Sequence, residues 1–301
     1  MDRYGFEGRV AVVTGAGRGI GRAYALLLAE RGASVVVNDL GGSMEGEGAD
    51  AGPASAVVTE IVGAGGVAVA DRNDVAGGAG ARALVDRAVE RYGRIDILVN
   101  NAGIIRWAGM PEVDEQNLTS HLAVHVGGSF NTVRAAWPRM VEQAYGRIVM
   151  TSSSGMFGLP TNLSYATAKA AVIGMTNSLA VAGAAHGIKV NVIAPAAMTR
   201  MAGPGADDSA DGTPMAPALV APMVAFLAHE DCPVSGEVYA AGAGRFARIF
   251  IAQTEGYVHA TLDPTVEDVA EHWAAINDET GYSVPTDLIG WSNAFLAHQS
   301  P

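Results

Sequence analysis

The stretch RVAVVTGAGRGIG, residues 9–21, joins a short apolar run to a glycine-rich turn and the beginning of a helical pattern. The run over 9–15 is rich in valine and lacks polar alternation, which is typical of a strand buried on both faces of a sheet. In the turn, Gly15, Gly19 and Gly21 would allow a tight bend, close approach of the backbone to a pyrophosphate, and close packing of the helix on the strand. The stretch therefore predicts a strand–turn–helix unit that binds a dinucleotide at a helix N-terminus.

The same alternation of strand and helix continues along the chain. Apolar runs predict further strands over residues 34–39, 66–75, 95–103, 146–153, 188–195 and 236–242. Helical patterns lie over residues 20–31, 53–63, 78–92, 114–141, 162–185 and 217–229. Because the strands are apolar throughout and alternate with helices, we predict a doubly wound α/β (Rossmann) fold, in which helices cover both faces of a seven-stranded parallel sheet. We assign residues 1–245 to this dinucleotide-binding and catalytic domain.

Residues 246–301 follow the last predicted strand, and we interpret them as a C-terminal helical arm that packs on the domain or on a neighbouring subunit. Within the arm, Asp263 and Pro264 suit the N-cap and the first position of a helix that continues through TVEDVAEHWAAIN. A second irregular segment, residues 202–216, is rich in Gly, Ala, Asp and Pro. It follows the C-terminal end of a predicted strand, where such sheets bind ligands, so we expect a mobile loop that selects the substrate.

The composition of the 301 residues excludes several classes of partner. The net charge is −12, whereas nucleic acid and anionic membrane surfaces require clustered Lys and Arg. The chain contains no run of about 18 apolar residues that would predict a membrane span. It has one cysteine, Cys232, so we expect no intrachain disulfide, no metal cluster and a cytoplasmic location. These exclusions favour a small-molecule substrate.

Asp39 ends the second predicted strand, about 20 residues beyond the glycine turn, where the dinucleotide fingerprint places an acidic residue on the ribose hydroxyls. A 2′-phosphate about 4 Å from this carboxylate would be repelled by about 4 kcal/mol at an effective dielectric constant of about 20. Asp39 therefore favours NAD over NADP. Arg18 in the glycine turn is a counter-signal, because a basic residue there could hold a 2′-phosphate. Gly17 and Ile20 complete the turn residues that we assign to the cofactor.

The stretch NLSYATAK, residues 162–169, places Tyr165 and Lys169 four residues apart near the start of a helix, so that both lie on one face. The Lys169 ammonium favours the Tyr165 phenolate and, together with the positive charge of an oxidised nicotinamide, could lower the tyrosine pKa from about 10 to about 7–8. Tyr165 would then act as the general base in alcohol oxidation and as the acid in ketone reduction. An isolated pair of this kind is otherwise an ordinary solvated helix surface.

Five motifs occur in order along the chain: TGAGRGIG (14–21), NDV (73–75), NNAG (100–103), SYATAK (164–169) and the AP pair that ends at Pro195. Over about residues 6–245 the sequence thereby resembles the short-chain dehydrogenase/reductase family. The resemblance implies that Asp74 and Val75 contact the adenine and that Lys169 holds the nicotinamide ribose. It also implies a further set of cofactor-binding residues: Asn100, Asn101, Ala102, Gly103, Tyr165, Pro195 and Thr199.

Longer stretches resemble one branch of that family, the (3R)-hydroxyacyl-CoA dehydrogenase parts of peroxisomal multifunctional enzymes. These stretches are residues 22–42, 100–106, 146–153, 193–201 and 235–244. The resemblance implies an NAD-dependent oxidoreductase that interconverts a secondary alcohol and a ketone, with a 3-hydroxyacyl-CoA or a hydroxysteroid-like substrate. It also implies a homodimer or homotetramer that pairs the long helices flanking the active site. Two alternatives stay open, an NADPH-dependent 3-oxoacyl reductase and a non-catalytic nucleotide-binding protein.

Two catalytic positions are ambiguous in the sequence. The family serine is Ser152 if it is counted from Tyr165, and Ser153 if the strand GRIVMTSS (146–153) is aligned. Strand register favours Ser153, because a one-residue slip inverts every side chain of a strand. Either hydroxyl would stabilise charge that develops on the reacting oxygen. Where the family usually has an Asn that helps to hold a proton-relay water, this chain has His125, which is either a catalytic residue or a structural one.

Overall fold

The computed structural model describes residues 4–202, 212–261 and 263–299. Its described part contains one sheet of eight strands in the order β3-β2-β1-β4-β5-β6-β7-β8. The strands are β1 (Val10–Thr14), β2 (Ser34–Asn38), β3 (Val67–Asp71), β4 (Ile97–Asn100), β5 (Gly146–Thr151), β6 (Ile188–Pro195), β7 (Val238–Gly242) and β8 (Arg245–Ile249). All neighbours from β3 to β7 pair in parallel. The predicted doubly wound fold is confirmed, with one strand more than expected.

The centre of the sheet is the point where the strand order reverses. Val12 of β1 pairs with Val36 of β2 on one side and with Leu98 of β4 on the other. The chain therefore leaves β1 and β4 toward opposite faces, and a crevice opens at the carboxyl ends of these strands. Every residue of β1, β4 and β5 is buried. Burial on both faces explains why these strands are apolar without alternation.

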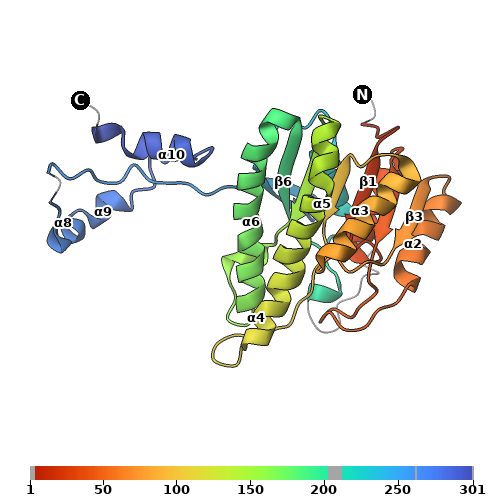
Figure 1. Ribbon diagram of the computed structural model, residues 1–301. Coiled ribbons are helices and arrows are strands. Elements are labelled where there is room, and N and C mark those ends of the chain that lie inside the picture. Colours follow the sequence, from red (N-terminus) through yellow and green to blue (C-terminus); the bar gives the residue numbers. More distant parts are fainter. Residues whose placement is uncertain (1–3, 203–211, 262, 300–301) are drawn as a thin grey trace. The chain divides into compact units, whose positions relative to one another are not determined.

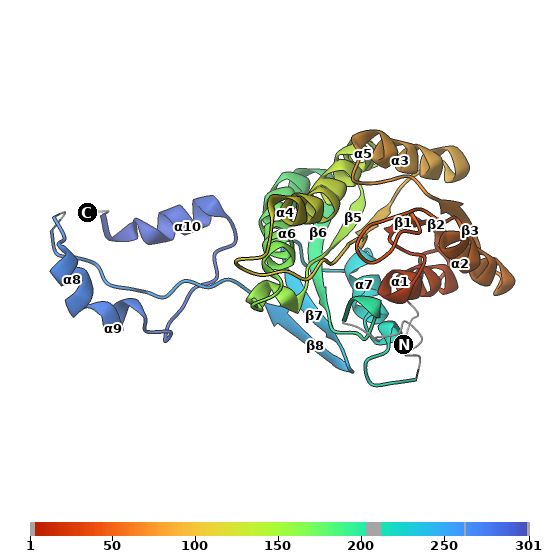
Figure 2. The same ribbon diagram turned by 90° about the horizontal axis from the view of Figure 1, so that it is seen from below.

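Helices form a layer on each face of the sheet (Figures 1 and 2). One layer contains α1 (Gly19–Glu30), α2 (Gly52–Gly63) and α7 (Ala221–Ala228). The other contains α3 (Gly78–Tyr92), α6 (Leu163–Gly183) and the segment α4 (Glu115–His121), η1 (Leu122–Gly128) and α5 (Ser129–Glu142). The segment η1 is a π-helical turn inside an otherwise continuous helix, a feature that often marks a functional site. Short 3₁₀ helices are η2 (Ser154–Phe157), η3 (Ala184–His186), η4 (Arg200–Ala202), η5 (Pro217–Leu219) and η6 (Ala297–Gln299).

Strand β8 was not predicted from the sequence. It follows β7 across a turn in which Ala243 and Gly244 both have positive φ, 51° and 75°. Two such residues are typical of a type I′ hairpin, and a two-residue connection requires antiparallel strands. The strand RFARI has only exposed and half-buried residues. The sequence criterion of a continuous apolar run therefore missed this edge strand.

The chain divides into two compact units, Met1–Arg248 and Ile249–Pro301. The predicted boundary at residue 245 falls at the start of β8. The second unit contains α8 (Val266–Glu271), α9 (Trp273–Ile276) and α10 (Leu288–Phe295). Its first helix begins later than expected, because Thr265, not Asp263, is the N-cap. Thr265 Oγ1 accepts from the Asp268 N–H, and the Asp268 carboxylate accepts from the Thr265 N–H, so the capping box pairs two backbone donors at once.

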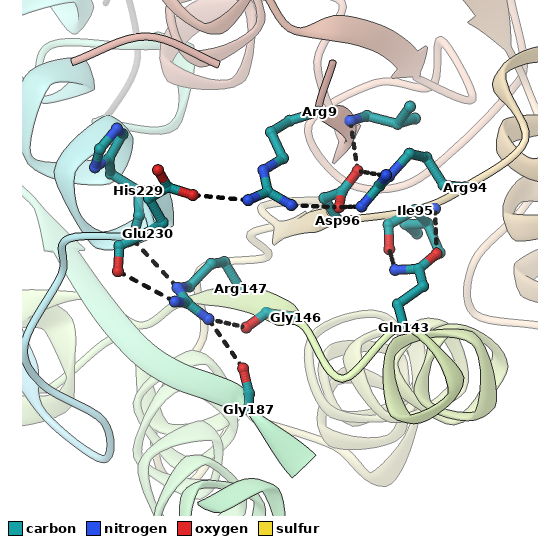
Figure 3. A network of polar contacts seen from close by, with 11 residues as sticks. Arg9, Arg94, Ile95, Asp96, Gln143, Gly146, Arg147, Gly187, His229 and Glu230 are labelled. Atoms are coloured by element: carbon teal, nitrogen blue, oxygen red, sulfur yellow. Dashed lines mark hydrogen bonds and ion pairs between the residues drawn. The ribbon is translucent and has the colours of Figure 1, made fainter. Parts of the chain in front are cut away.

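A network of charged side chains joins the amino ends of the central strands, away from the crevice (Figure 3). The buried Asp96 carboxylate accepts from the Val10 N–H at 2.9 Å and pairs with Arg94 at 2.6 Å and Arg9 at 3.3 Å. Arg9 also pairs with Glu230 at 2.7 Å. The buried Arg147 guanidinium instead donates to backbone carbonyls, among them His229 and Gly187. These bonds tie β1, β4 and β5 to the segment that follows α7.

Candidate active site

A cavity of about 530 Å³ occupies the crevice at the carboxyl ends of the strands. Most residues that the sequence assigns to the site line it: Gly15, Arg18, Gly19, Ile20, Asp39, Asp74, Val75, Asn101, Ala102, Gly103, Ser152, Ser153, Tyr165, Lys169, Pro195 and Thr199. Gly17, Gly21 and His125 are not among its lining residues. The predicted substrate-selecting loop, residues 202–216, lies largely outside the described residues, but the cavity is lined by Met201, which precedes the loop, and by Met215 near its end.

The glycine turn brings its backbone close to neighbouring strands and loops. Gly15 and Gly19 have positive φ, 61° and 53°, which side chains other than glycine rarely adopt. A Cβ on Gly21 would lie 2.2 Å from the Gly15 carbonyl oxygen, and a Cβ on Gly15 would lie 2.8 Å from Ala102 Cα. Gly15 and Gly21 therefore allow the turn to pack closely on the helix and on Ala102, as a pyrophosphate-binding turn of this kind requires.

Asp39 lies beside the glycine turn and fixes its backbone. Its carboxylate accepts from the Gly17 N–H at 2.8 Å and from the Gly41 N–H at 2.7 Å. The neighbouring Arg18 lines the same cavity, and its Nη1 is buried without a hydrogen-bond partner in the described part of the protein. Since none of the described residues pairs with this guanidinium nitrogen, it is available to an anionic ligand. The turn thus offers both a carboxylate for hydroxyls and a cation for a phosphate oxygen.

Two polar residues that sequence reasoning missed, Asp71 and Asn38, support the predicted adenine side together with Asn73 of the NDV motif. The buried Asp71 carboxylate accepts from Asn38 Nδ2 at 2.8 Å and from the N–H and Nδ2 of Asn73 at 2.9 and 2.7 Å. Asn38 Nδ2 also donates to the Asn73 carbonyl. These bonds hold the loop that carries Asp74 and Val75 into the cavity. The signal was available, since Asp71 and Asn38 are polar residues that end strands.

Asn100 and Asn101 have different surroundings. Asn101 donates from Nδ2 to the carbonyls of Thr14 and Gly15, both at 3.0 Å, and thereby joins β4 to the glycine turn. The side chain of Asn100 is buried away from the cavity lining and accepts from Thr132 Oγ1 at 2.7 Å. Of the NNAG motif, the cavity is therefore lined by Asn101 and the two residues that follow it.

Tyr165 and the two candidate serines lie at one end of the cavity. The Ser153 side chain lies near enough to the Tyr165 hydroxyl to lower the pKa of the tyrosine. Ser152 Oγ instead donates to the Lys169 carbonyl at 2.8 Å, on the helix that carries the tyrosine. Ser153 also accepts from the Gly155 N–H at 3.0 Å, which orients its hydroxyl at the start of η2. Only Ser153 is therefore placed to share an oxygen ligand with Tyr165.

Lys169 is buried beneath the tyrosine. Its Nζ donates to the Thr151 carbonyl at 2.9 Å and lies 5.5 Å from the centre of the Tyr165 ring. Burial lowers the Lys169 pKa to about 7. Burial also raises the pKa of Tyr165, an effect that the Ser153 side chain opposes. The predicted lowering of the tyrosine pKa relied on two cations, Lys169 and an oxidised nicotinamide. In the protein alone desolvation is the largest effect, and it raises the tyrosine pKa instead of lowering it.

His125 packs against the backbone beside this site. Its Nε2 lies 2.8 Å from the Ile104 carbonyl oxygen, and its ring leaves no space for a Cβ on Gly103, which would be 2.5 Å from Cε1. A second histidine, His121, was not singled out in the sequence. It stacks on His125 with ring centres 6.0 Å apart, and both rings stand edge-on to Tyr165. Their spacing of four residues on one helix could have indicated this pair.

Comparison with known proteins agrees with this arrangement. The family model described as short chain dehydrogenase matches residues 9–208, which contain the glycine turn, both serines and the Tyr165–Lys169 pair. The chain belongs to the short-chain dehydrogenase family. This dehydrogenase is therefore an oxidoreductase that uses a nicotinamide cofactor, and the glycine turn, Asp39 and the unpaired nitrogen of Arg18 fit such a group.

Several relatives are known. Over 277 residues the dehydrogenase is 45% identical to peroxisomal multifunctional enzyme type 2 of Drosophila melanogaster. This alignment covers 91% of this chain and 46% of the relative. The chain thus spans about half of that relative's length. A short chain dehydrogenase structure from Mycobacterium avium superposes with a TM-score of 0.76 at 37% identity, covering 90% of this chain and 95% of that one. The structure of a 7α-hydroxysteroid dehydrogenase complexed with NADH and 7-oxo glycochenodeoxycholic acid superposes with a TM-score of 0.70 at 29% identity. The match covers 81% of this chain and 98% of that one.

The described residues contain neither a membrane-spanning helix nor a metal-binding cluster. No helix of the described segments is long and apolar enough to span a membrane. No cluster of three or more His, Cys, Asp or Glu that could hold a metal ion occurs in that part of the chain. Cys232 is buried as a free thiol.

Proposed function

We propose that this dehydrogenase oxidises a secondary alcohol with NAD and that its substrate is a 3-hydroxyacyl-CoA or a hydroxysteroid-like molecule. The observation that carries the proposal is the position of Tyr165 and Ser153 in the same cavity as the glycine turn and Asp39. The names of the relatives support the substrate class, since they include a multifunctional peroxisomal enzyme and a hydroxysteroid dehydrogenase.

In this proposal each residue has one task. Tyr165 takes the proton of the alcohol as general base, and Ser153 donates a hydrogen bond to the reacting oxygen. Lys169, held by the Thr151 carbonyl, supplies a positive charge next to the phenolate and a donor for the nicotinamide ribose. The bound nicotinamide would accept the hydride from the carbinol carbon. His125 fixes the backbone at Ile104 beside the tyrosine, which favours a positioning role for it.

The choice of NAD rests on Asp39. Its carboxylate lies at the end of β2 beside the glycine turn, where a 2′-phosphate would be repelled. The competing NADPH-dependent 3-oxoacyl reductase draws its support from Arg18, whose Nη1 is buried and unpaired among the described residues. Fluorescence titration with NADH and NADPH separates the two, and tighter binding of NADPH would reject the NAD assignment. A non-catalytic nucleotide-binding protein requires a damaged site, whereas Tyr165, Lys169 and Ser153 are all present.

The substrate class is tested by turnover. Wild-type protein is assayed with NAD against 3-hydroxyacyl-CoA thioesters of increasing chain length and against hydroxysteroids. The proposal expects turnover of at least one of these classes, with the rate falling when Tyr165 is replaced. Activity confined to small alcohols or sugars would contradict the substrate proposal while leaving the chemistry of the site intact.

We also propose that the protein assembles as a homodimer or homotetramer. The exposed side of α5 and α6 carries apolar side chains, among them Phe130, Leu163 and Val181. The second unit has no buried residue within its described part, although Trp273, Leu288 and several other apolar side chains belong to it. A unit without a core of its own gains stability by packing on another surface. The cytoplasmic location remains a prediction from the single cysteine.

A further inference from the structure

The segment that leaves β4, residues 104–107, carries side chains into the cavity. Ile104, Ile105 and Trp107 line it, and Trp107 is 42% exposed at the cavity surface. The segment has no place in the sheet, because β4 ends at Asn100. Its backbone must therefore be fixed by other groups if these side chains are to hold one position.

Histidines supply two of those groups. His121 Nε2 accepts from the Arg106 N–H at 3.2 Å, and His125 Nε2 lies 3.2 Å from the Ile104 nitrogen and 2.8 Å from the Ile104 oxygen. The two histidines are four residues apart on one helix, and the residues they contact, Ile104 and Arg106, are two apart in the segment that follows β4. The helix thus holds the segment at two successive points.

Both backbone polar groups of Arg106 bond to side chains of the same helix. Asn117 Nδ2 donates to the Arg106 carbonyl at 3.1 Å, while His121 receives the Arg106 N–H. His121 Nδ1 lies 2.8 Å from the Asn117 carbonyl oxygen. A neutral imidazole with its proton on Nδ1 satisfies both contacts, as a donor to Asn117 and as an acceptor for Arg106.

The surroundings keep both imidazoles neutral. His121 and His125 are buried, and they face each other as well as Tyr165 and Lys169 of α6. The cations near them are Lys169 and Arg106, and burial is the largest cause that lowers the pKa of both histidines. A protonated His121 would have a donor at Nε2 facing the Arg106 N–H, so the anchor requires the neutral form.

We infer that His121 is a positioning residue: with His125 it anchors the backbone at residues 104–106 and so sets where Trp107 stands at the cavity surface. The effect of the anchor on substrate binding rests on the proposed function. The anchor itself is a property of the folded protein and can be tested without a substrate.

Two substitutions of His121 separate the anchor from ring packing. His121→Gln keeps an acceptor at the distance of Nε2, whereas His121→Asn keeps only a group at the position of Nδ1, which reaches Asn117 but not Arg106. Both variants lose the imidazole that stands edge-on to Tyr165. Amide hydrogen exchange over residues 103–108 is measured in both, and exchange over β5 reports whether the fold is intact.

The expected result is exchange at Arg106 about 5–10-fold faster in His121→Asn and near wild type in His121→Gln, as the loss of one hydrogen bond predicts. With 3-hydroxydecanoyl-CoA and NAD, His121→Asn should raise KM by a similar factor and change kcat and NADH affinity by less than about 2-fold. Trp107→Ala should raise the same KM without changing exchange at Arg106.

Equal exchange in both variants and in wild type would overturn the anchor. An unchanged KM in Trp107→Ala would overturn its link to the substrate. If the wild-type protein turned over none of the proposed substrates, the proposed function would fail, and exchange would still decide the anchor.

Discussion

Lys169 is buried and Tyr165 is half-buried, and desolvation favours the neutral form of each. The tyrosine pKa is raised and the lysine pKa is lowered to about 7, so the protein alone does not hold a phenolate–ammonium pair. Ser153 is the polar group that opposes the shift of the tyrosine. If Tyr165 acts as a general base, the additional positive charge that stabilises its phenolate must therefore come from the bound cofactor. Residue identity defines the pair, and its surroundings determine its protonation.

Replacement of Tyr165 tests the acid–base role directly. Tyr165→Phe removes one hydroxyl and keeps the ring that packs against His121 and His125. We expect NADH binding to be retained and turnover to fall at least ~10²-fold, the contribution of one positioned acid–base group. Steady-state kinetics and fluorescence titration on the same preparation provide both numbers. Turnover close to wild type would remove the tyrosine from the mechanism.

Lys169 should make stability depend on pH. Between the folded-state pKa of about 7 and the ordinary value of 10.5, the unfolded chain binds a proton at this lysine that the folded protein does not bind. The free energy of unfolding of the cofactor-free protein should therefore gain a contribution that rises with pH across this window and is absent below it. Lys169→Met should lack that rise. Urea denaturation of both proteins at several pH values measures it, and parallel profiles would contradict the buried neutral amine.

Asp39 should control cofactor preference. Asp39→Ala removes the carboxylate that would repel a 2′-phosphate and also frees the Gly17 and Gly41 N–H groups. We expect NADH affinity to fall and NADPH affinity to rise, because Arg18 stays beside the turn. The ratio of the two dissociation constants is the measurement. A ratio equal to that of the wild type would place the ribose elsewhere.

The two ends of the strands have different roles, ligand binding at the carboxyl ends and stability at the amino ends. At the carboxyl edge, the glycine turn, the loop after β3 and the segment after β4 are held by polar side chains that leave the cavity open. At the amino edge, Asp96 and Arg147 close the ends of β1, β4 and β5 with buried bonds (Figure 3). The π-helical turn η1 interrupts the helix where His125 contacts Ile104. Stability and ligand binding are thus supported by separate groups.

Asp96 tests this division. Asp96→Ala leaves the buried Val10 N–H without its acceptor and removes the shared partner of Arg9 and Arg94. We expect a loss of about 2–4 kcal/mol in the free energy of unfolding with NADH affinity unchanged. Arg94→Met is the matched control; because Arg94 is 40% exposed, its loss should cost about 1 kcal/mol or less. Equal effects of the two substitutions would contradict a buried carboxylate at the centre of the network.

For the whole molecule, the exposed apolar side chains predict assembly into an oligomer. We expect sedimentation at micromolar concentration to give a species of at least twice the chain mass of 30.8 kDa. Val181→Arg on α6 should weaken assembly if this helix lies in the interface. Val62→Arg on α2 is the control, because its exposure of 54% is close to the 58% of Val181. A single 30.8 kDa species with full activity would contradict the proposal.

The sequence by itself determined the fold and the location of the site. Gly15 has a positive φ, and a Cβ on Gly21 would meet the Gly15 carbonyl oxygen, so the turn requires glycine for reasons within a few residues. The valine-rich strands are buried on both faces, and this signal is local too. The motif residues from Asp39 to Lys169 then fall at the carboxyl edge by topology. The edge strand β8 and the N-cap Thr265 were not predicted from the sequence, because neither lies in a continuous apolar run.

Only the tertiary structure decided which side chains meet. It placed the hydroxyl of Ser153, and not that of Ser152, beside Tyr165, because β5 and α6 approach in a register that no single segment encodes. It brought His121 to the backbone of Arg106, and it removed Asn100 from the cavity lining. The pKa directions also belong to this level, since desolvation depends on what surrounds a group. Sequence spacing selects the residues, whereas distances and burial determine what they can do.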